Sequence, residues 1–214
     1  MRHGFAHQIR FSPRIVLDGL SHPRWLASVW MGTGMPRLEN LADFLPPGAT
    51  ASQMADFSRQ QRNPSFDWTD LRRIRDAWTG PLILKGVMCV DDALQARALG
   101  VDGVVVSNHG GRQLDGAAAT LDVLPDIVAA VGETATVMID SGFRRGTDIA
   151  KALALGAKAV LLGRATLYGL AAGGEVGAAK ALSILQDELV RTIRLLGRNK
   201  AAALSTDILM LNGR

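Results

Sequence analysis

From residue 68 onward, short apolar runs alternate with segments of helical spacing, and this alternation constrains the fold more than any other feature. The apolar runs cover 81–87, 103–107, 136–139 and 158–162, and their Val, Ile and Leu content predicts buried strands. Helical spacing covers 68–78, 91–99, 120–131, 147–155, 165–170 and 175–196. Strands that alternate with helices predict an α/β fold with a parallel sheet.

An internal repeat narrows this fold class further. Residues 98–107 (ALGVDGVVVS) resemble residues 154–163 (ALGAKAVLLG), a separation of 56 residues, from 98 to 154. An even repeat of strand–helix units favours a (β/α) barrel over an open sheet. Only four strands are predicted, whereas a complete TIM barrel has eight and typically about 250 residues. We therefore predict half of a (β/α)8 barrel.

Residues 1–65 differ from the rest because prolines and glycines interrupt any periodicity. We expect a long loop segment with short helices near 24–30 and 52–60. Its apolar residues, among them Trp25 and Trp30, are interleaved with arginines, which suits a membrane interface. The alternative is a loop that packs on its own domain. The predicted division is a loop segment at 1–65 and a partial barrel, carrying the site, at 66–214.

The composition limits the class of protein. Apolar residues make up 48% of the chain and charged residues 21%, which is ordinary for a globular protein. No apolar run approaches the roughly 18 residues of a membrane span, and no signal-peptide pattern follows Met1. The single cysteine, Cys89, indicates a reducing compartment, and we expect it in the core. The net charge of +4 is concentrated in residues 1–40, which favours an anionic partner surface.

The strand at 103–107 ends in a polar, glycine-rich turn that carries His109 and Arg112. Ligands of α/β folds bind at the carboxyl ends of the strands. Histidine can accept a proton near neutral pH, and arginine can hold a carboxylate with two hydrogen bonds. These two residues are therefore candidate catalytic residues. The alternative is a glycine turn with a surface histidine and arginine.

The other strand ends carry further candidates, which are Lys85, residues 140–145 and residues 163–164. Barrels often bind phosphate with the loops after the last two strands and the N-terminus of a short helix. Gly142 and Gly163 would expose backbone N–H groups there, and Arg164, with Arg144 or Arg145, would neutralise the phosphate. The alternative is that these arginines lie on ordinary surface turns.

The string SNHGGRQLD at 107–115 closely resembles the active-site signature of the FMN-dependent α-hydroxy acid dehydrogenase/oxidase family. The resemblance extends from about Ser12 to the C-terminus, and residues 15–25 and 34–36 look most like the mandelate dehydrogenase branch. It implies a C-terminal half barrel with strands 5–8. It also implies that His109 takes a proton from the substrate, that Arg112 binds the substrate carboxylate, and that Lys85 stabilises the reduced flavin. The implied FMN contacts are Lys85, Ser107, Asp140, Ser141, Gly142, Phe143, Arg144, Gly163 and Arg164.

The resemblance further implies oxidation of an L-2-hydroxy acid of the lactate or mandelate type to the 2-oxo acid. Residues 12–37 would face a membrane, and FMN would pass electrons to a quinone or respiratory-chain acceptor. The expected location is cytoplasmic, peripheral on the inner face of the cell membrane, and the expected assembly is a homo-oligomer. Neither a metal nor a nucleic-acid partner is expected.

The four earlier strands of the family find no match here, nor does the aspartate that orients the catalytic histidine. We therefore expect a truncated form with impaired activity. Two alternatives stay open. One is a remnant that only binds flavin or only associates with membrane. The other is a phosphate-binding barrel lyase or isomerase in which Lys85 forms a Schiff base.

Overall fold

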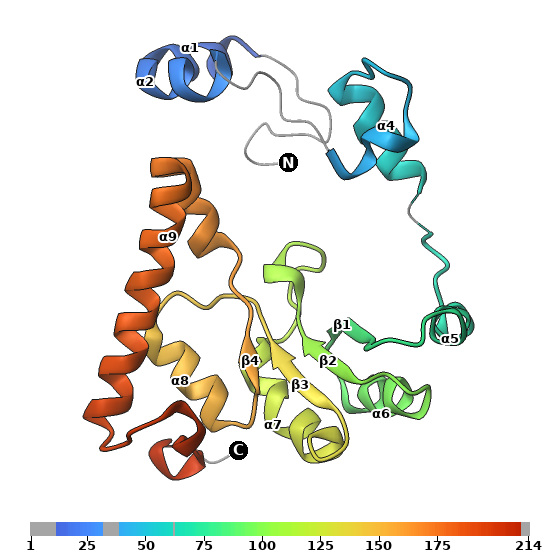
Figure 1. Cartoon of the computed structure of the whole chain (residues 1–214), viewed down its shortest axis with the longest axis vertical. Helices are drawn as coiled ribbons and strands as arrows, with labels where there is room; N and C mark the ends of the chain where they lie inside the picture. Colours follow the sequence, from blue (N-terminus) through green and yellow to red (C-terminus); the bar gives the residue numbers. More distant parts are fainter. Residues whose placement is uncertain (1–11, 32–38, 62, 211–214) are drawn as a thin grey trace. The chain divides into compact units, whose positions relative to one another are not determined.

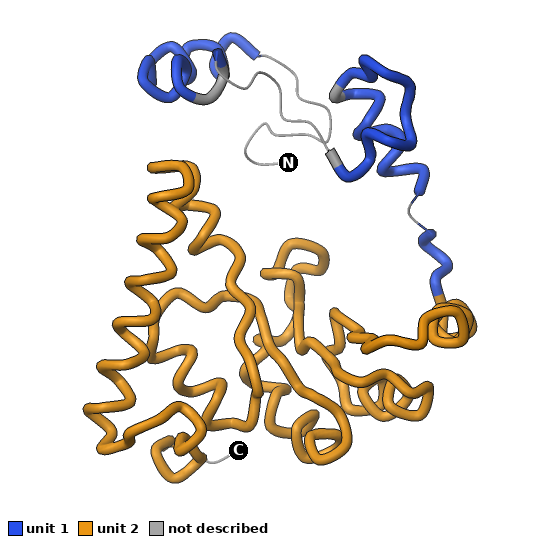
Figure 2. Tube along the Cα trace, in the orientation of Figure 1, with its two compact units in different colours: residues 1–66 blue, residues 67–214 orange. Residues whose placement is uncertain are grey.

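The computed structural model of the chain describes residues 12–31, 39–61 and 63–210 (Figure 1). The chain divides into two compact units, residues 1–66 and residues 67–214 (Figure 2). The first is helical where it is described, and the second contains the sheet.

The first unit contains α1 (Pro13–Ser21), α2 (Pro23–Trp25), the π-helix η1 (Leu26–Trp30), the 3-10 helix η2 (Glu39–Phe44) and α4 (Ala51–Gln60). The short helices predicted near 24–30 and 52–60 are present, but α1 was not predicted. It begins at Ser12, whose side chain accepts a hydrogen bond from the N–H of Ile15, with Pro13 in the first turn. The pair Ser12–Pro13 is the sequence signal that marks this helix.

The second unit is built on a parallel sheet in the order β1-β2-β3-β4. Its strands are β1 (Ile83–Val87), β2 (Gly103–Val106), β3 (Thr136–Ile139) and β4 (Ala159–Val160), so all four predicted strands are present. Its helices are α5 (Trp68–Ala77), α6 (Val90–Ala98), α7 (Thr120–Val131), α8 (Gly146–Ala154) and α9 (Arg164–Leu195), with 3-10 turns η3 (His109–Gly111), η4 (Ala201–Ala203) and η5 (Thr206–Ile208). The break predicted between 170 and 175 occurs inside α9, where Gly173 and Gly174 leave the helical conformation.

One face of the sheet forms the core. Successive residues of a strand point to opposite faces, and the buried members of β2 and β3 on the helical side are Val104, Val106, Val137 and Ile139. They pack with buried side chains of α6, α7 and α8. This core fixes the strands, and therefore fixes where their carboxyl ends lie.

Cys89 is exposed, so the prediction that it lies in the core is wrong. The strand β1 ends at Val87, two residues earlier, and Cys89 is the residue that precedes α6. The apolar run in the sequence therefore continues past the strand into a solvent-facing turn.

Candidate functional site

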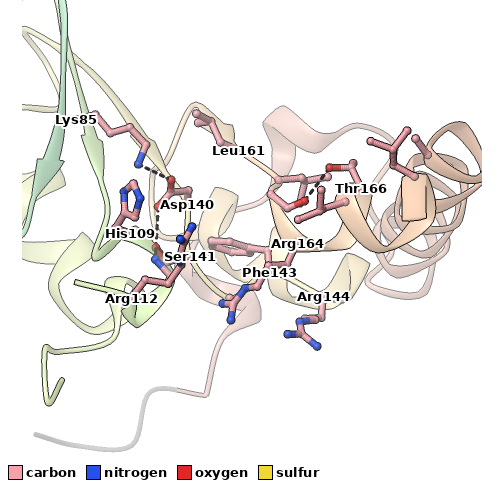
Figure 3. A pocket seen from close by; sticks show the side chains of 17 residues that line it. Lys85, His109, Arg112, Asp140, Ser141, Phe143, Arg144, Leu161, Arg164 and Thr166 are labelled. Carbon is pink, nitrogen blue, oxygen red and sulfur yellow. Dashed lines mark hydrogen bonds and ion pairs between the residues drawn. The ribbon is translucent and has the colours of Figure 1, made fainter. Parts of the chain in front are cut away.

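A cavity of about 610 Å³ lies at the carboxyl ends of the strands, within the second unit (Figure 3). Lys85 reaches it from β1, His109 and Arg112 from the loop after β2, and residues 140–144 from the loop after β3. The end of β4 and the start of α9 complete the lining. The predicted site residues line this cavity, except Ser107 and Arg145. Ser107 is a buried neighbour that contacts Lys85.

Lys85 is held by two oxygen atoms at one end of the cavity. Its Nζ lies 2.9 Å from Oδ2 of Asp140 and donates a hydrogen bond of 2.9 Å to Oγ of Ser107. Figure 3 shows the Lys85 side chain pointing toward Asp140. Asp140 was predicted only as a cofactor contact. The structure adds that its carboxylate fixes the position of the ammonium group.

The carboxyl group of Asp140 is stabilised in its charged form. Partial burial raises its pKa, but hydrogen bonds from Ser107, Lys85 and Ser141 and the charge of Lys85 outweigh that effect. The net result is a pKa below the ordinary value of 3.8. Asp140 is therefore an anion at neutral pH and cannot serve there as a proton donor.

His109 lies in a strained turn at the mouth of the cavity. Its φ is 57°, a left-handed value, and its backbone N–H donates a hydrogen bond of 3.1 Å to Oγ of Ser107. The side chain of Asn108 supports the same turn, because it accepts a hydrogen bond from the N–H of Gly111 and donates one to the carbonyl of Ala118. Among the residues that the structure describes, none hydrogen-bonds to the His109 imidazole, and none forms an ion pair with Arg112. Both side chains are therefore available to a ligand.

The opposite end of the cavity is cationic. Gly163 precedes α9, so the first N–H groups of that helix and its dipole favour an anion there. Arg164 lies against the His109 turn, since a Cβ on Gly110 would be 3.4 Å from its Nη2. The Arg144 guanidinium lies over the ring of Tyr168, 5.7 Å from its centroid.

The structure also decides between Arg144 and Arg145 as the second arginine of this end. Arg144 lines the cavity, whereas Nη1 of Arg145 pairs with Oε1 of Glu188 at 3.0 Å. Phe143 is almost fully buried and belongs to the core as well as to the lining.

Several lining residues were not predicted, and they are Leu161, Leu162, Thr166, Leu167, Leu170 and Ala178. Leu161 and Leu162 end the predicted strand at 158–162, so their place at a strand end was a usable signal. Thr166 follows Gly163 within one turn, and its Oγ1 donates a hydrogen bond of 2.8 Å to the Gly163 carbonyl. For Ala178, which follows the break at Gly173 and Gly174 in α9, the sequence offers no signal.

The arrangement of donors fits a cofactor that carries a phosphate at one end and a polar ring edge at the other. The helix N-terminus with Arg144 and Arg164 suits the phosphate. The ammonium of Lys85, which lines the same cavity from the end of β1, suits a ring edge that gains negative charge. FMN has this distribution of charge.

Comparison with known proteins supports the same class. The sequence pattern of the FMN-dependent dehydrogenase family matches residues 1–211. (S)-mandelate dehydrogenase of Pseudomonas putida is 46% identical over 210 residues, which are 98% of this chain and 52% of that protein. L-lactate dehydrogenase of Azorhizobium caulinodans is 42% identical over 198 residues, 92% of this chain and 52% of that protein. L-lactate oxidase of a Nostoc species is 48% identical over 167 residues, 78% of this chain and 46% of that protein.

The fold comparison agrees. A crystal structure described as the monotopic membrane protein (S)-mandelate dehydrogenase is 46% identical, with a TM-score of 0.88 over 94% of this chain and 52% of that chain. The predicted partial TIM barrel is thereby confirmed, and the chain spans about half the length of the relatives it matches. With the family pattern matched along almost its entire length, the chain belongs to the FMN-dependent dehydrogenases.

Proposed function

We propose that this chain provides one half of a site that oxidises an L-2-hydroxy acid of the lactate or mandelate type to the 2-oxo acid. The observation that carries the proposal is the convergence of Lys85, His109 and Arg112 on one cavity with a cationic far end. The relatives named as lactate and mandelate dehydrogenases support the substrate class.

Arg112 and His109 have complementary tasks in this proposal. A 2-hydroxy acid is an anion, and the guanidinium of Arg112, which has no carboxylate partner among the described residues, can anchor its carboxylate with two hydrogen bonds. His109, three positions earlier on the same turn, accepts the proton that leaves the substrate. The turn thus places the anchor and the base on one short, strained segment.

Bound FMN would take up the two electrons that leave the substrate. Lys85 would offer its positive charge to the ring edge on which negative charge develops, and Asp140 and Ser107 hold that ammonium in place. Ser107, Ser141, Gly142 and Phe143 would line the cofactor, while Arg144, Gly163 and Arg164 would hold its phosphate.

The orientation of His109 is the weak point of the site in this chain. Within 12–31, 39–61 and 63–210 no carboxylate fixes the imidazole, so its tautomer and direction are not set. We therefore expect impaired turnover from the 214-residue chain alone. Robust turnover by the purified chain would contradict this expectation.

Residues 12–37 form the proposed membrane-facing segment, and residues 32–37 of it lie outside the described residues. In α1 and α2, Val16, Leu17, Leu20 and Trp25 are exposed. No helix in the described part of the chain is long and apolar enough to cross a membrane. The proposal is a peripheral contact on the cytoplasmic side, with a quinone or respiratory-chain acceptor nearby. Flotation with anionic lipid vesicles tests it: Leu17→Asp with Leu20→Asp should abolish co-flotation, and Phe44→Asp, another exposed apolar position, should not.

The proposed function is tested by an absorption spectrum of the purified, desalted chain after refolding with FMN. The expected result is a flavin band that stays with the protein and loses its absorbance without oxygen when L-lactate or L-mandelate is added, at a slow rate because turnover is expected to be impaired. Retained flavin without bleaching would support a flavin-binding remnant instead. No retained flavin, together with borohydride trapping of a carbonyl substrate on Lys85, would favour the lyase or isomerase class.

A further inference from the structure

The second unit contains the same βαβ arrangement twice. In β1-α6-β2, Ile83 lies opposite Gly103, and in β3-α8-β4, Met138 lies opposite Ala159. Left-handed glycines recur 56 residues apart in the two copies. Gly86, within β1, and Gly142, after β3, have φ of 102° and 93°, and Gly100 and Gly156, after the helices, have φ of 78° and 102°. The strand registers of the two copies differ by one residue, since the pair Ile83–Gly103 is 20 positions apart and the pair Met138–Ala159 is 21. The sequence repeat is therefore a repeat of structure.

The repeat assigns each outer strand a counterpart inside the sheet. The strand β4 corresponds to β2, and β1 corresponds to β3. The strands β2 and β3 are paired with each other, and Val105 lies opposite Met138. Among the described residues, no strand pairs with the free edge of β4 or with the free edge of β1. The edge of β2 that pairs with β3 therefore corresponds to the unpaired edge of β4. The strand that would pair with β4 in the same way corresponds to β3, and that strand is β1.

Transferring the β2–β3 register to β4 and the β1 of another molecule predicts a specific contact. Leu161, directly after β4, corresponds to Val105, and Ile83 corresponds to Met138. The transferred register places these two side chains opposite each other. Both are large apolar side chains left open to solvent in one chain, with 37% of Leu161 and 50% of Ile83 exposed.

The helices that precede β3 and β1 also differ in burial. In α7, before β3, Leu124, Ile127 and Val131 are fully buried. The matching positions before β1 are Leu71 and Ile74 of α5 and Trp78, the residue directly after that helix, with the same spacing. Leu71 is buried, but Ile74 is 41% exposed and Trp78 is 54% exposed. The exposed apolar side chains of Ile74 and Trp78 therefore lie next to β1, at the predicted junction between β1 of one copy and β4 of the other.

We propose that two copies of this chain pair through these edges and close an eight-stranded parallel barrel. The β4 edge of each copy accepts β1 of the other, so one kind of junction is used twice around a two-fold axis along the barrel. Four strands per copy give the eight at which a parallel (β/α) sheet closes. A closed pair removes both exposed edges, whereas a single copy leaves their backbone groups unpaired. The relatives agree in size, since this chain covers 52% of the mandelate dehydrogenase structure. This inference does not depend on the proposed chemistry.

A disulfide trap tests the register. In a Cys89→Ser background, Ile83→Cys with Leu161→Cys should form a disulfide-linked dimer that reductant reverses. Within one copy these positions are three strand spacings apart, about 14 Å along the sheet, whereas a disulfide requires Cα atoms within about 7 Å. Leu94→Cys is the matched control, since Leu94 is 42% exposed and belongs to the helix α6 rather than to an edge strand. Leu94→Cys with Leu161→Cys should stay monomeric on a non-reducing gel.

The mass of the unmodified chain is the second, independent test, and it needs no FMN. Sedimentation equilibrium should give twice the chain mass of 22.8 kDa. Ile83→Lys should give the single chain mass with an unchanged far-ultraviolet spectrum, because it buries a charge in the junction. A single chain mass at all concentrations would overturn the proposal. A dimer, or a larger assembly, that the Ile83–Leu161 pair fails to trap would overturn it as well, because another surface would then hold the copies.

Discussion

The side-chain oxygen of Ser141 accepts a hydrogen bond of 2.9 Å from the N–H of Gly110, the residue after His109. The same hydroxyl donates a hydrogen bond of 2.7 Å to Oδ1 of Asp140. Ser141, with φ of 79°, and His109, with φ of 57°, are the non-glycine residues in a left-handed conformation within the described residues. Such a conformation costs about 1–3 kcal/mol at each residue unless its surroundings hold it. The two strained loops therefore hold each other.

Replacing Ser141 by alanine tests this connection. The strain at position 141 remains, but the hydrogen bond to Gly110 is lost, at a net cost of about 0.5–1.5 kcal/mol. We expect hydrogen exchange at the Gly110 amide to become up to about tenfold faster, while exchange within β2 and β3 stays unchanged. Mass-spectrometric or NMR exchange measures this. Equal exchange in both proteins would mean that the turn is held by Asn108 and Ser107 alone.

The pairing of Asp140 with Lys85 predicts a pH dependence of stability. The pKa of Asp140 is lowered in the folded chain. As the pH falls to about 4 and below, the ordinary range of a free carboxyl, the folded state therefore binds fewer protons than the unfolded state. This stabilisation is present above the unfolded pKa and is lost as the pH falls through the lower, folded pKa. Urea unfolding from pH 6 to pH 2.5 should therefore show a steeper loss in the native chain than in Asp140→Asn. Asp76→Asn, at an exposed position on α5, should follow the native chain.

The sequence predicted the strands of the second unit because each is an apolar, β-branched run between clear helix boundaries. It predicted Lys85, His109 and Arg164 for a related reason, since residues at the carboxyl ends of parallel strands meet at one edge. The contact between Lys85 and Asp140 was not predictable from spacing. It arises because β1 and β3 flank β2, and a sheet order is not visible in the local pattern.

The incorrect and incomplete predictions have local causes. Cys89 was assigned to the core because the apolar run that includes Val87 and Met88 gives no sign of where β1 ends. The helix α1 was missed because it is short and lies in a stretch that prolines and glycines interrupt, although the Ser12 cap and Pro13 mark its start. Which of Arg144 and Arg145 faces the cavity depends on Glu188 in α9, which is distant in sequence.

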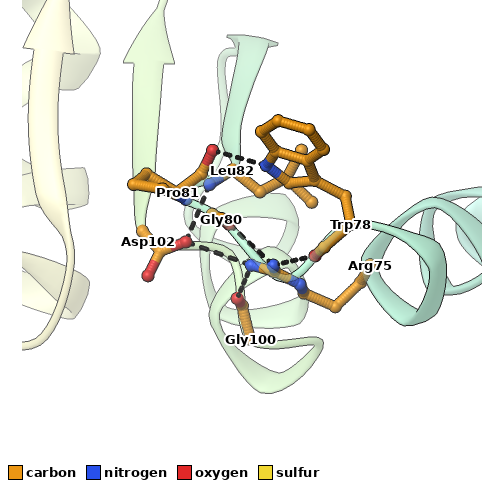
Figure 4. Close-up of polar contacts among 7 residues, drawn as sticks. All are labelled: Arg75, Trp78, Gly80, Pro81, Leu82, Gly100 and Asp102. Carbon is orange, nitrogen blue, oxygen red and sulfur yellow. Dashed lines mark hydrogen bonds and ion pairs between the residues drawn. The ribbon is translucent and has the colours of Figure 1, made fainter.

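Arg75 fastens α5 to the base of the sheet (Figure 4). Its Nη1 donates hydrogen bonds of 3.1 Å to the Gly100 carbonyl and to Oδ2 of Asp102, and its Nη2 donates one of 2.7 Å to the Gly80 carbonyl and another to the Trp78 carbonyl. Asp102 in turn accepts a hydrogen bond of 2.8 Å from the N–H of Leu82. One side chain thus joins the end of α5 to the residues that precede β1 and β2.

Arg75→Met should therefore destabilise the second unit while keeping most of the side-chain volume. We expect the free energy of unfolding to fall by about 2 kcal/mol, because several carbonyls lose a charged donor. Arg73→Met is the matched control on the same helix, since the Arg73 side chain is 74% exposed and its ion pair is with Asp70, three positions earlier. Its effect should stay within about 0.5 kcal/mol. Similar denaturation midpoints for the two variants would show that the Arg75 contacts contribute little.

Arg144 and Arg145 offer a matched test of the cationic end of the cavity, because they are neighbours that face different groups. If Arg144 donates to the phosphate as proposed, Arg144→Ala should weaken FMN binding about 10- to 100-fold. Arg145→Ala should leave FMN affinity within a factor of about 3, since its guanidinium pairs with Glu188. Fluorescence titration measures both affinities.

Riboflavin, which lacks the phosphate, separates a charge effect from a change in cavity shape. Arg144→Ala should bind riboflavin as the native chain does, because its lost donor has no phosphate to contact. If Arg144→Ala weakened both flavins equally, the side chain would instead shape the cavity through its position over the Tyr168 ring. If neither arginine affected FMN binding, the phosphate would have to be held by Arg164 and the N-terminus of α9 alone.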